Sequence, residues 1–259
     1  MRRHSIWWER AGHMSIAIML PGRSQSRAKY NVPRQIMREE LLAVLQRSRR
    51  SAKNDEQLDM LRTSNRREVF LNYAGDIEAL QSPTVSIVGT REVSEKGWKR
   101  ATRLARQLAE QDITVMSGLA RGVDTAALTG AMRASGRVAA VIGTPLTKAY
   151  PAENTGLQEE IYRSHLLISP FDDNEPVFKS NFPKRNRVMA LLSDATVIIE
   201  ASDTSGTLHQ AAECQRLGRW LFIAKSVTEN SALRWPASFL GKPKTAILGE
   251  VSDITAVLR

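Results

Sequence analysis

The sequence predicts an α/β fold built on a doubly wound parallel sheet, with a small helical N-terminal extension. Short apolar runs recur along the chain after Pro83, and a longer segment separates each run from the next. Several of the separating segments have the amphipathic or small-residue pattern of helices. Strands that are apolar on both faces and alternate with helices are typical of a parallel sheet covered on its two sides.

The predicted strands and helices follow one another in regular alternation. The strands lie at residues 84–89, 113–116, 137–143, 165–169, 195–201 and 220–225, and the clearest helices at 94–111, 122–135 and 205–218. Together they define a Rossmann-like domain over residues 83–226. Such domains bind ligands where the carboxyl ends of the strands lead into helix N-termini, so the loops at that edge are the candidate site.

Three further segments surround this domain. Residues 1–34 are basic, show no sustained period and predict a loose arm. In residues 35–82 the apolar positions recur with a helical period, which predicts two helices, over about 36–45 and 58–69. Residues 227–259 are too few for another core and predict a tail that packs on the domain.

The composition favours a polyanionic partner. The net charge is +10 with a pI near 10.1, and a positive field attracts nucleic acid above all. Part of this charge belongs to the N-terminal arm, so charge alone is a weak indicator. The one cysteine, Cys214, excludes an intramolecular disulfide and a Cys-based zinc site, and it indicates a reducing cytoplasm.

Neither a membrane nor a cofactor is expected. No apolar run approaches the ~20 residues that span a bilayer. Glu9 and His13 interrupt the only stretch that resembles a secretion signal. His209 is the best placed of the four histidines, but no acidic pair or second His lies at a spacing that would make it a metal ligand, so no metal and no other cofactor is predicted.

The loop after the first strand, GTREVS, has the pattern of a phosphate cradle. Gly89 ends the strand, Arg91 lies in the turn and Ser94 can cap the next helix. A phosphate there would meet backbone N–H groups, the positive end of the helix dipole and a guanidinium. The alternative is that Gly89 only permits a tight turn while Arg91 is a solvated charge.

Two more loops have a similar pattern. SGLARGVD places Arg121 between Gly118 and Gly122 at a helix start, with Asp124 in the first turn. Neither this loop nor the first has the spacing of a Walker loop or of GxGxxG, which disfavours triphosphate hydrolysis and a dinucleotide cofactor. A third loop offers the hydroxyls and amides of Ser205, Gly206 and Thr207, although the simpler interpretation is an ordinary N-cap.

The stretch NFPKRNRVMALLS concentrates cations before an apolar helix. Lys184, Arg185 and Arg187 would stand at the helix start, where positive charge opposes the dipole at a cost of a few tenths of a kcal/mol each. A bound anion would reverse that balance, and Phe182 offers a flat face on which a base could stack. The alternative is a charge run on a solvated surface.

Taken in order, GTREVS, SGLARGVDTAA, VIGTPLTKAYPAEN, NFPKRNRVMALLS, VIIEA and SGTL resemble the DNA-processing protein A family (DprA, also called Smf) over residues 83–226. The resemblance implies a homodimer that binds single-stranded DNA in a basic pocket and loads a RecA-type recombinase onto the strand. The DNA- or phosphate-binding positions are then Gly89, Arg91, Ser94, Ser117, Gly118, Arg121, Gly122, Phe182, Lys184, Arg185, Asn186, Arg187, Ser205, Gly206 and Thr207. No catalytic residue is implied.

This chain departs from the family pattern at several positions. Leu128 stands where the family commonly has His, Ser169-Pro170 replaces Ser-Glu, and FIAKS at 222–226 replaces a strand end that typically reads FAVPG. The chain is also too short for a C-terminal winged helix. It therefore resembles a divergent, shortened member, compatible with DNA recombination, DNA processing or a role in phage defence.

An enzyme of a related Rossmann-like group is the alternative function. Those phosphoribohydrolases split nucleoside monophosphates with a PGGxGTxxE loop. When SGT is aligned on that loop, Gln210 falls where the carboxylate would be and Ser205 takes a glycine position. A Gln cannot act as the base, so the sequence favours a binding protein over an enzyme, with a small-nucleotide sensor as a third interpretation.

Overall fold

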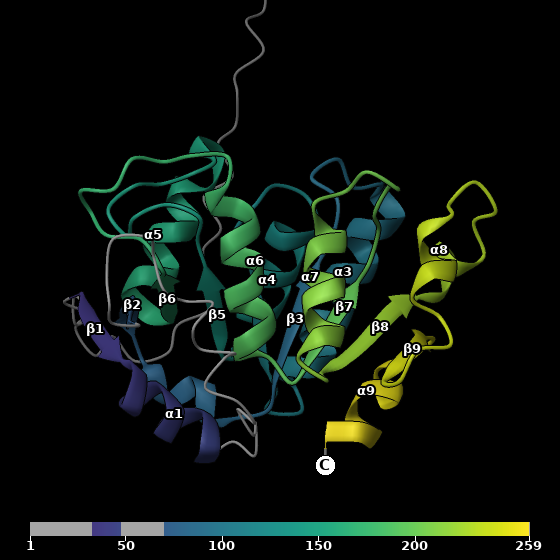
Figure 1. Ribbon diagram of the computed structural model, residues 1–259, viewed down its shortest axis with the longest axis horizontal. Helices are drawn as coiled ribbons and strands as arrows, with labels where there is room; N and C mark the ends of the chain where they lie inside the picture. Colours follow the sequence, from purple (N-terminus) through teal and green to yellow (C-terminus); the bar gives the residue numbers. More distant parts are fainter. Residues whose placement is uncertain (1–32, 48–69, 259) are drawn as a thin grey trace, which may run out of the picture.

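The computed structural model describes residues 33–47 and 70–258, and these residues form a nine-stranded mixed sheet with helices on both faces (Figure 1). The strands are β1 (Arg34–Met37), β2 (Phe70–Gly75), β3 (Thr84–Val88), β4 (Thr114–Ser117), β5 (Val138–Val141), β6 (Leu166–Ser169), β7 (Ala195–Ile198), β8 (Trp220–Ala224) and β9 (Thr245–Leu248). The helices are α1 (Arg38–Arg47), α3 (Glu95–Ala109), α4 (Val123–Arg133), α5 (Thr155–Ser164), α6 (Asn181–Leu192), α7 (Thr207–Arg216), α8 (Lys225–Thr228) and α9 (Val251–Leu258). Short 3-10 turns lie at Ile77–Gln81, Ala152–Asn154 and Trp235–Ser238.

The strand order places a switch point at the centre of the sheet. The order is β1-β2-β6-β5-β4-β3-β7-β8-β9, and the run from β6 to β9 is parallel. Val85 of β3 pairs with Val115 of β4 on one side and with Ala195 of β7 on the other. The chain winds outward from β3 in one direction and then, from β7, in the other, so a crevice is expected between these strands at their carboxyl ends.

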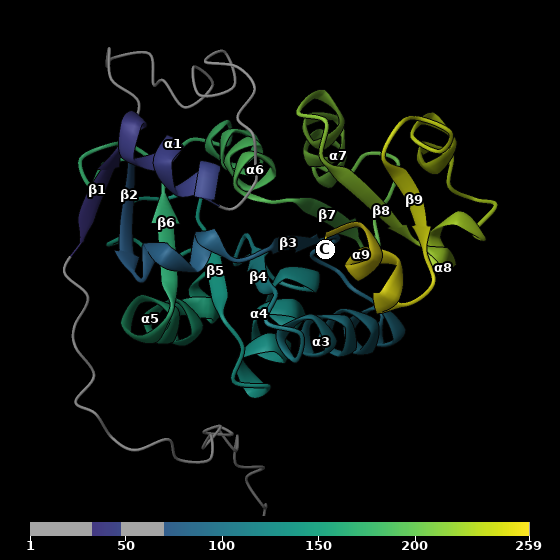
Figure 2. The same cartoon turned by 90° about the horizontal axis from the view of Figure 1, so that it is seen from below.

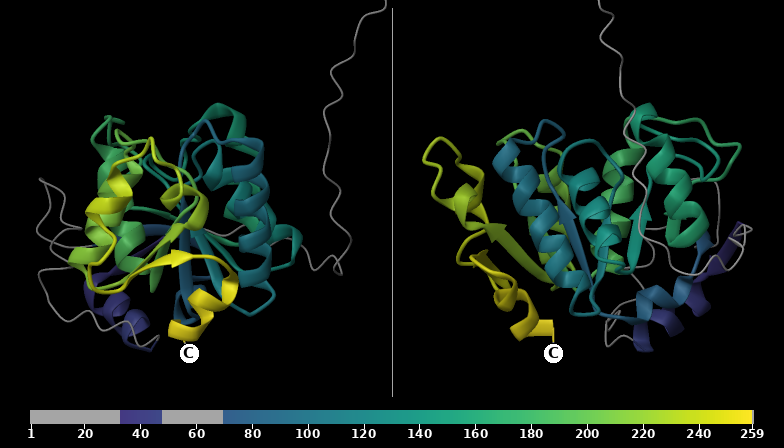
Figure 3. Two further views of the ribbon diagram at one scale, coloured as in Figure 1. Left: turned by 90° about the vertical axis from the view of Figure 1, so that its right-hand side faces the viewer. Right: turned by 180° about the vertical axis from the view of Figure 1, so that it is seen from behind.

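Helices cover the two faces of the sheet, which confirms the doubly wound architecture. Viewed from below, α1, α6 and α7 lie on one side, and α3, α4 and α5 on the other (Figure 2); the edge-on view has the same layers (Figure 3). Successive strand residues pack into opposite cores: Val85 and Ile87 face the α3–α4 side, whereas Val88 and Met116 face the α6–α7 side. All of these side chains are buried, as a parallel sheet requires.

The N-terminal extension is part of the same sheet, which differs from the helical pattern expected there. Arg34–Met37 forms strand β1 instead of helix; β1 is antiparallel to β2, and β2 is antiparallel to β6. The helix begins only at Arg38, where the Glu40 carboxylate accepts the Met37 N–H at 3.2 Å, as in a capping box. The expected second helix, residues 58–69, and the arm up to residue 32 lie outside the described residues.

The C-terminal segment also extends the sheet. Thr245–Leu248 adds β9 in parallel to β8, and α9 then contacts α3. The tail predicted to pack on the domain thus supplies its last strand and helix. Among the helices in the described ranges, none has both the length and the apolarity to cross a membrane.

Candidate nucleic-acid interface

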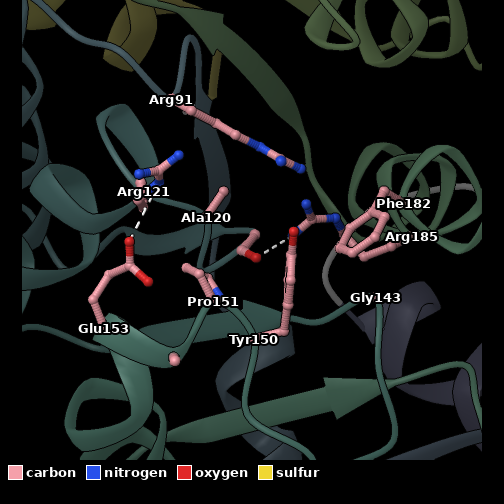
Figure 4. Close-up of a pocket in the computed structure, with 11 residues that line it drawn as sticks. Arg91, Ala120, Arg121, Gly143, Tyr150, Pro151, Glu153, Phe182 and Arg185 are labelled. Carbon is pink, nitrogen blue, oxygen red and sulfur yellow. Dashed lines mark hydrogen bonds and ion pairs between the residues drawn. The ribbon is translucent and has the colours of Figure 1, made fainter. Parts of the chain in front are cut away.

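A groove crosses the carboxyl edge of the sheet at the switch point. It consists of two adjoining pockets, of about 290 and 490 Å³. The two pockets are continuous because both are lined by Arg91, Ala120, Arg121, Phe182 and Arg185. The first pocket, between the β4 and β5 loops and α6, is the one in Figure 4; the second continues over the ends of β3 and β7. We call the two together the groove.

Arg185 forms the floor of the groove. Its side chain is only 5% exposed and donates hydrogen bonds to the carbonyl oxygens of Gly118 and of Val141, the latter at 2.9 Å. A side chain at Gly118 would overlap this guanidinium, so the glycine is there for close approach. Arg185, which the sequence predicts to bind phosphate, therefore uses part of its hydrogen-bonding capacity to hold the ends of β4 and β5 together.

A buried carboxylate balances the Arg185 charge. Asp124, 5% exposed in the first turn of α4, accepts the Ala120 N–H at 3.2 Å. Burial raises the pKa of Asp124, and the Arg185 charge opposes that shift. Burial also lowers the pKa of Arg185, while Asp124 acts to raise it. Each group thus stabilises the charged form of the other where both are largely removed from solvent.

Aromatic rings form one wall of the first pocket. Phe182 is half-buried at the start of α6, and Tyr150 is 45% exposed. Their ring centroids are 5.2 Å apart. The Arg91 guanidinium carbon is 5.6 Å from the Phe182 ring centroid, within range of a cation–π contact. In Figure 4, Arg91, Phe182 and Tyr150 reach toward the same space. The wall therefore combines an accessible aromatic surface with a cation, the pair of groups that binds a base next to its phosphate.

The two rim arginines differ in their partners. Arg121 lies 3.5 Å from the carboxylate of Glu153, and both side chains are more than half exposed. A pair so exposed contributes little to stability and can open to an incoming anion. Within the described part of the chain, no carboxylate is at ion-pair distance from Arg91. The groove thus holds a cation whose charge is available to a ligand.

Lys184 and Arg187 lie outside the pocket lining, on the exposed side of α6. The helix begins at Asn181, so these cations lie within its first two turns instead of before it. Pro183 fits inside this helix because Pro is tolerated in the first turn, where its missing N–H has no acceptor. Both charges extend the positive surface beyond the groove.

The loop before α7 closes the second pocket. The Thr207 hydroxyl donates to the carbonyl of Gly89 at 3.2 Å, and the Ser205 hydroxyl accepts the Thr207 N–H at 3.2 Å. Asn186 donates to the carbonyl of Gly206 at 3.4 Å, which links α6 to this loop. Because each of these side chains has an internal partner, the loop offers a ligand mainly the helix N-terminus.

Three other expected site residues have structural roles. Ser117 is fully buried and donates to the carbonyl of Ile87 at 2.7 Å. Ser94 caps α3 by accepting the Gly97 N–H at 3.0 Å, and its own hydroxyl and amide are bound by Glu200. Gly122 starts α4 with a positive φ of 76°, close to the carbonyls of the Arg91 turn. The structure thus brings most of the predicted loops together, but it buries Ser117 and binds the Ser94 hydroxyl and amide within the protein.

Four residues in or behind the groove received no binding role from the sequence: Tyr150, Asp124, Glu200 and Gln210. Tyr150 had a usable signal, because an aromatic residue directly before Pro151 in a loop at the sheet edge is a candidate ligand contact. Gln210 is fully buried in the second pocket, and its Oε1 atom lacks a protein partner within the described chain.

Among the described residues, no group of three or more His, Cys, Asp or Glu side chains could hold a metal ion. The polar lining of the groove combines Arg91, Arg121 and Arg185 with the carboxylates of Glu92, Asp124 and Glu153. The arginine side chains and the N-terminus of α7 are groups that suit an anion.

The doubly wound sheet, with a groove lined by arginines and aromatic rings at its switch point, defines a Rossmann-like domain. The family model for DNA recombination-mediator protein A matches residues 51–256. The chain belongs to this family, as the ordered motifs predicted.

Curated relatives agree with this assignment. DNA processing protein DprA of Streptococcus pneumoniae is 38% identical over 154 residues, which cover 60% of this chain and 54% of the relative. Protein Smf of Escherichia coli is 33% identical over 163 residues, covering 62% and 44%. The chain thus spans about half the length of the curated relatives it matches.

Solved structures share the fold. The X-ray structure of DNA processing protein A from S. pneumoniae superimposes with a TM-score of 0.66 at 30% identity, covering 80% of this chain and 72% of the other. DNA processing protein A from Helicobacter pylori gives a TM-score of 0.66 at 26% identity, covering 78% and 91%. The Helicobacter protein was studied for its single-stranded DNA binding mode.

Proposed function

We propose that this chain binds single-stranded DNA in the groove and acts as a recombination mediator. The observation that carries the proposal is the juxtaposition of Arg91, without a carboxylate partner among the described residues, and the half-buried Phe182 ring. A phosphate bound by the arginine would leave its base beside the Phe182 and Tyr150 rings. Membership of the family and the Helicobacter relative's single-strand binding support the same ligand.

Single strands suit this groove better than duplexes. A base in a duplex is stacked on both faces, so only an unpaired base can stack on Phe182 without the cost of extrusion. The cations contact phosphates, which position a strand without reading its sequence. We therefore expect a preference for single strands with little dependence on sequence.

Several finer properties are part of the proposal. The resemblance to the family implies a homodimeric assembly and the loading of a RecA-type recombinase. We also propose a cytoplasmic location, the absence of catalytic turnover and service in a phage-defence system. The first two are the family properties that would connect the groove to recombination, because a bound strand must be handed to a partner.

A small-nucleotide sensor is the second candidate, supported by the second pocket. The α7 N-terminus could bind a phosphate there, while the orphan Oε1 of buried Gln210 would accept one hydrogen bond. The phosphoribohydrolase alternative receives no such support, because the same residue is an amide and cannot act as the base. Competition by nucleoside monophosphates against a labelled oligonucleotide separates the sensor from the strand binder.

The test of the main proposal removes the two exposed α6 cations. Lys184→Ala/Arg187→Ala should weaken single-strand binding roughly tenfold and reduce the slope of log K against log salt by about 1.4, since each neutralised phosphate contributes ~0.7. Fluorescence anisotropy with a labelled single-stranded oligonucleotide across a salt series measures both quantities.

The matched control removes the same charge elsewhere. Arg103 on α3 and Arg133 at the end of α4 are exposed and do not line the groove. Arg103→Ala/Arg133→Ala should keep the wild-type salt slope. Equal losses in the two double variants would mean that net charge, and not the α6 surface, attracts the strand.

A further inference from the structure

The carboxylate of Glu200 occupies the place where the sequence predicts a ligand phosphate. It lies at the N-terminus of α3, where Oε2 accepts the Ser94 N–H at 3.0 Å and Oε1 accepts the Ser94 hydroxyl at 2.6 Å. Arg100 Nη1 is 3.8 Å from Oε1. An amide at a helix start, a hydroxyl and a guanidinium are the groups that a phosphate would use. The first strand-to-helix turn therefore already contains its anion.

The helix start is shaped around this carboxylate. A Cβ atom at Gly97 would overlap the Glu200 carboxyl group. The carboxyl group therefore fits against the first turn of α3 because Gly97 has no side chain. A negative charge at this position is also stabilised by the helix dipole. The Glu200 side chain is only 24% exposed, and exchange of its carboxylate for a ligand anion would require it to leave these partners.

Glu200 also holds the other end of the same loop. Its backbone carbonyl accepts the Thr90 N–H at 2.8 Å. The segment Thr90–Ser94 is thus hydrogen-bonded at both ends to one residue beyond β7, at the far side of the switch point. Arg91, the cation above the Phe182 ring, lies inside that segment.

We propose that Glu200 is a positioning residue: an internal anion that fills the first turn in place of a ligand phosphate and fixes the loop that aims Arg91 into the groove. This inference rests on the proposed function. It also assigns specificity, because a ligand whose phosphate must bind at the α3 N-terminus, such as a dinucleotide, is excluded there. Strand phosphates are directed to Arg91 instead.

The sign of the effect separates positioning from charge. Removal of a carboxylate near a basic groove should, by electrostatics alone, tighten the binding of a polyanion. Loss of the loop's anchor should weaken it. Glu92, in the same loop, lines the second pocket with an exposed side chain. Only its backbone N–H takes part in the loop, where it donates to the Thr90 hydroxyl, so Glu92→Ala removes a carboxylate from the groove without loss of the anchor.

The experiment is a double-mutant cycle with a labelled single-stranded oligonucleotide at fixed salt. Glu200→Ala, Arg91→Ala and the combined variant are compared with the full wild-type chain, with Glu92→Ala as the charge control. Glu200→Ala should weaken binding about tenfold, which corresponds to the loss of one hydrogen bond to a charged group. In the Arg91→Ala background, the same substitution should weaken binding by less than about twofold. Glu92→Ala should bind as tightly as the wild type or more tightly.

Ser94→Ala interrupts the same contact from the loop side and provides the comparison if Glu200→Ala does not fold. The loss of binding affinity in Ser94→Ala should likewise depend on the presence of Arg91. The role of Glu200 would be overturned if Glu200→Ala bound the strand as tightly as the wild type or more tightly, or if it lost equal affinity with and without Arg91. Either result would leave the groove as the binding site. Failure of the wild type to bind single strands would overturn the proposed function, and the role of Glu200 with it.

Discussion

The cations of the FPKRNR motif have different surroundings although they are neighbours in sequence. Arg185 is buried beneath Gly118 and bonded to backbone carbonyls, whereas Lys184 and Arg187 are exposed. A helix turns by about 100° per residue, so adjacent positions cannot all face one ligand. The motif is therefore better described as one structural arginine flanked by two surface charges.

A second residue-scale consequence concerns Cys214. The thiol is fully buried and contacts the carbonyl of Trp220 at 3.0 Å. Desolvation raises the pKa of this thiol from 9.0 to about 12. Since the thiolate is the reactive form, Ellman's reagent at pH 8 should modify the native protein far more slowly than the protein in denaturant, where the one thiol of the chain should react at once.

The raised pKa of Cys214 also predicts how the free energy of unfolding changes with pH. An acid whose pKa is higher in the folded state holds its proton there after the unfolded chain has lost it. The contribution of Cys214 to the free energy of unfolding should therefore fall as pH rises from 9.0 toward about 12. Chemical denaturation of wild type and Cys214→Ala over this range isolates the contribution; parallel curves for the two proteins would contradict it.

At the scale of elements, the central strands were predictable and the edge strands were not. Runs such as those of β3 and β7 are short, apolar and bounded by glycine or by loops, and their length favours a buried strand over a helix. In contrast, RQIM runs directly into REELLAVLQR with no turn residue between them, so the sequence pattern groups Ile36 with the helix of Leu41 and Leu45. Only the pairing of β1 with β2, a contact between segments more than thirty residues apart, determines that Ile36 is in a strand.

Contacts between segments far apart in sequence also limit what can be predicted of the candidate site. The phosphate-cradle loops were recognisable because glycine, arginine and a capping residue follow one another in sequence. The Glu200 contact with Ser94 and the Arg185 contact with Val141 join residues of different elements that are far apart in sequence. Local patterns do not report whether a predicted cradle is already filled by a side chain of the protein itself.

Incorporation of β1 and α1 into the sheet leads to a stability prediction. Leu41 on α1 is fully buried and belongs to the same apolar core as Leu71 and Leu80. Leu41→Ala should lower the free energy of unfolding by about 3 kcal/mol, from lost burial and the cavity left behind. Urea denaturation followed by circular dichroism gives the value. A change below about 0.5 kcal/mol would show that this segment is a detachable extension.

At the scale of the whole molecule, the topology gathers loops distant in sequence at one edge of the sheet. Strand β3 and its two neighbours, β4 and β7, deliver the loops that carry Arg91, Arg121 and Thr207 to this edge, and α6 adds Phe182 beside them. The proposal assigns to Asp124 and Glu200 the task of balancing or positioning the cations instead of competing for the ligand. The result is a positive groove within a fold that is otherwise shared by many unrelated functions.

The measurement that tests this account most directly is the salt dependence of wild-type binding to matched single-stranded and double-stranded oligonucleotides, by fluorescence anisotropy. The account predicts tighter binding of the single strand at every salt concentration, with a log–log slope of about −0.7 for each phosphate neutralised. It also predicts little change when the sequence of the strand is altered. Equal affinity for duplex and single strand, or a slope near zero, would contradict the proposed function.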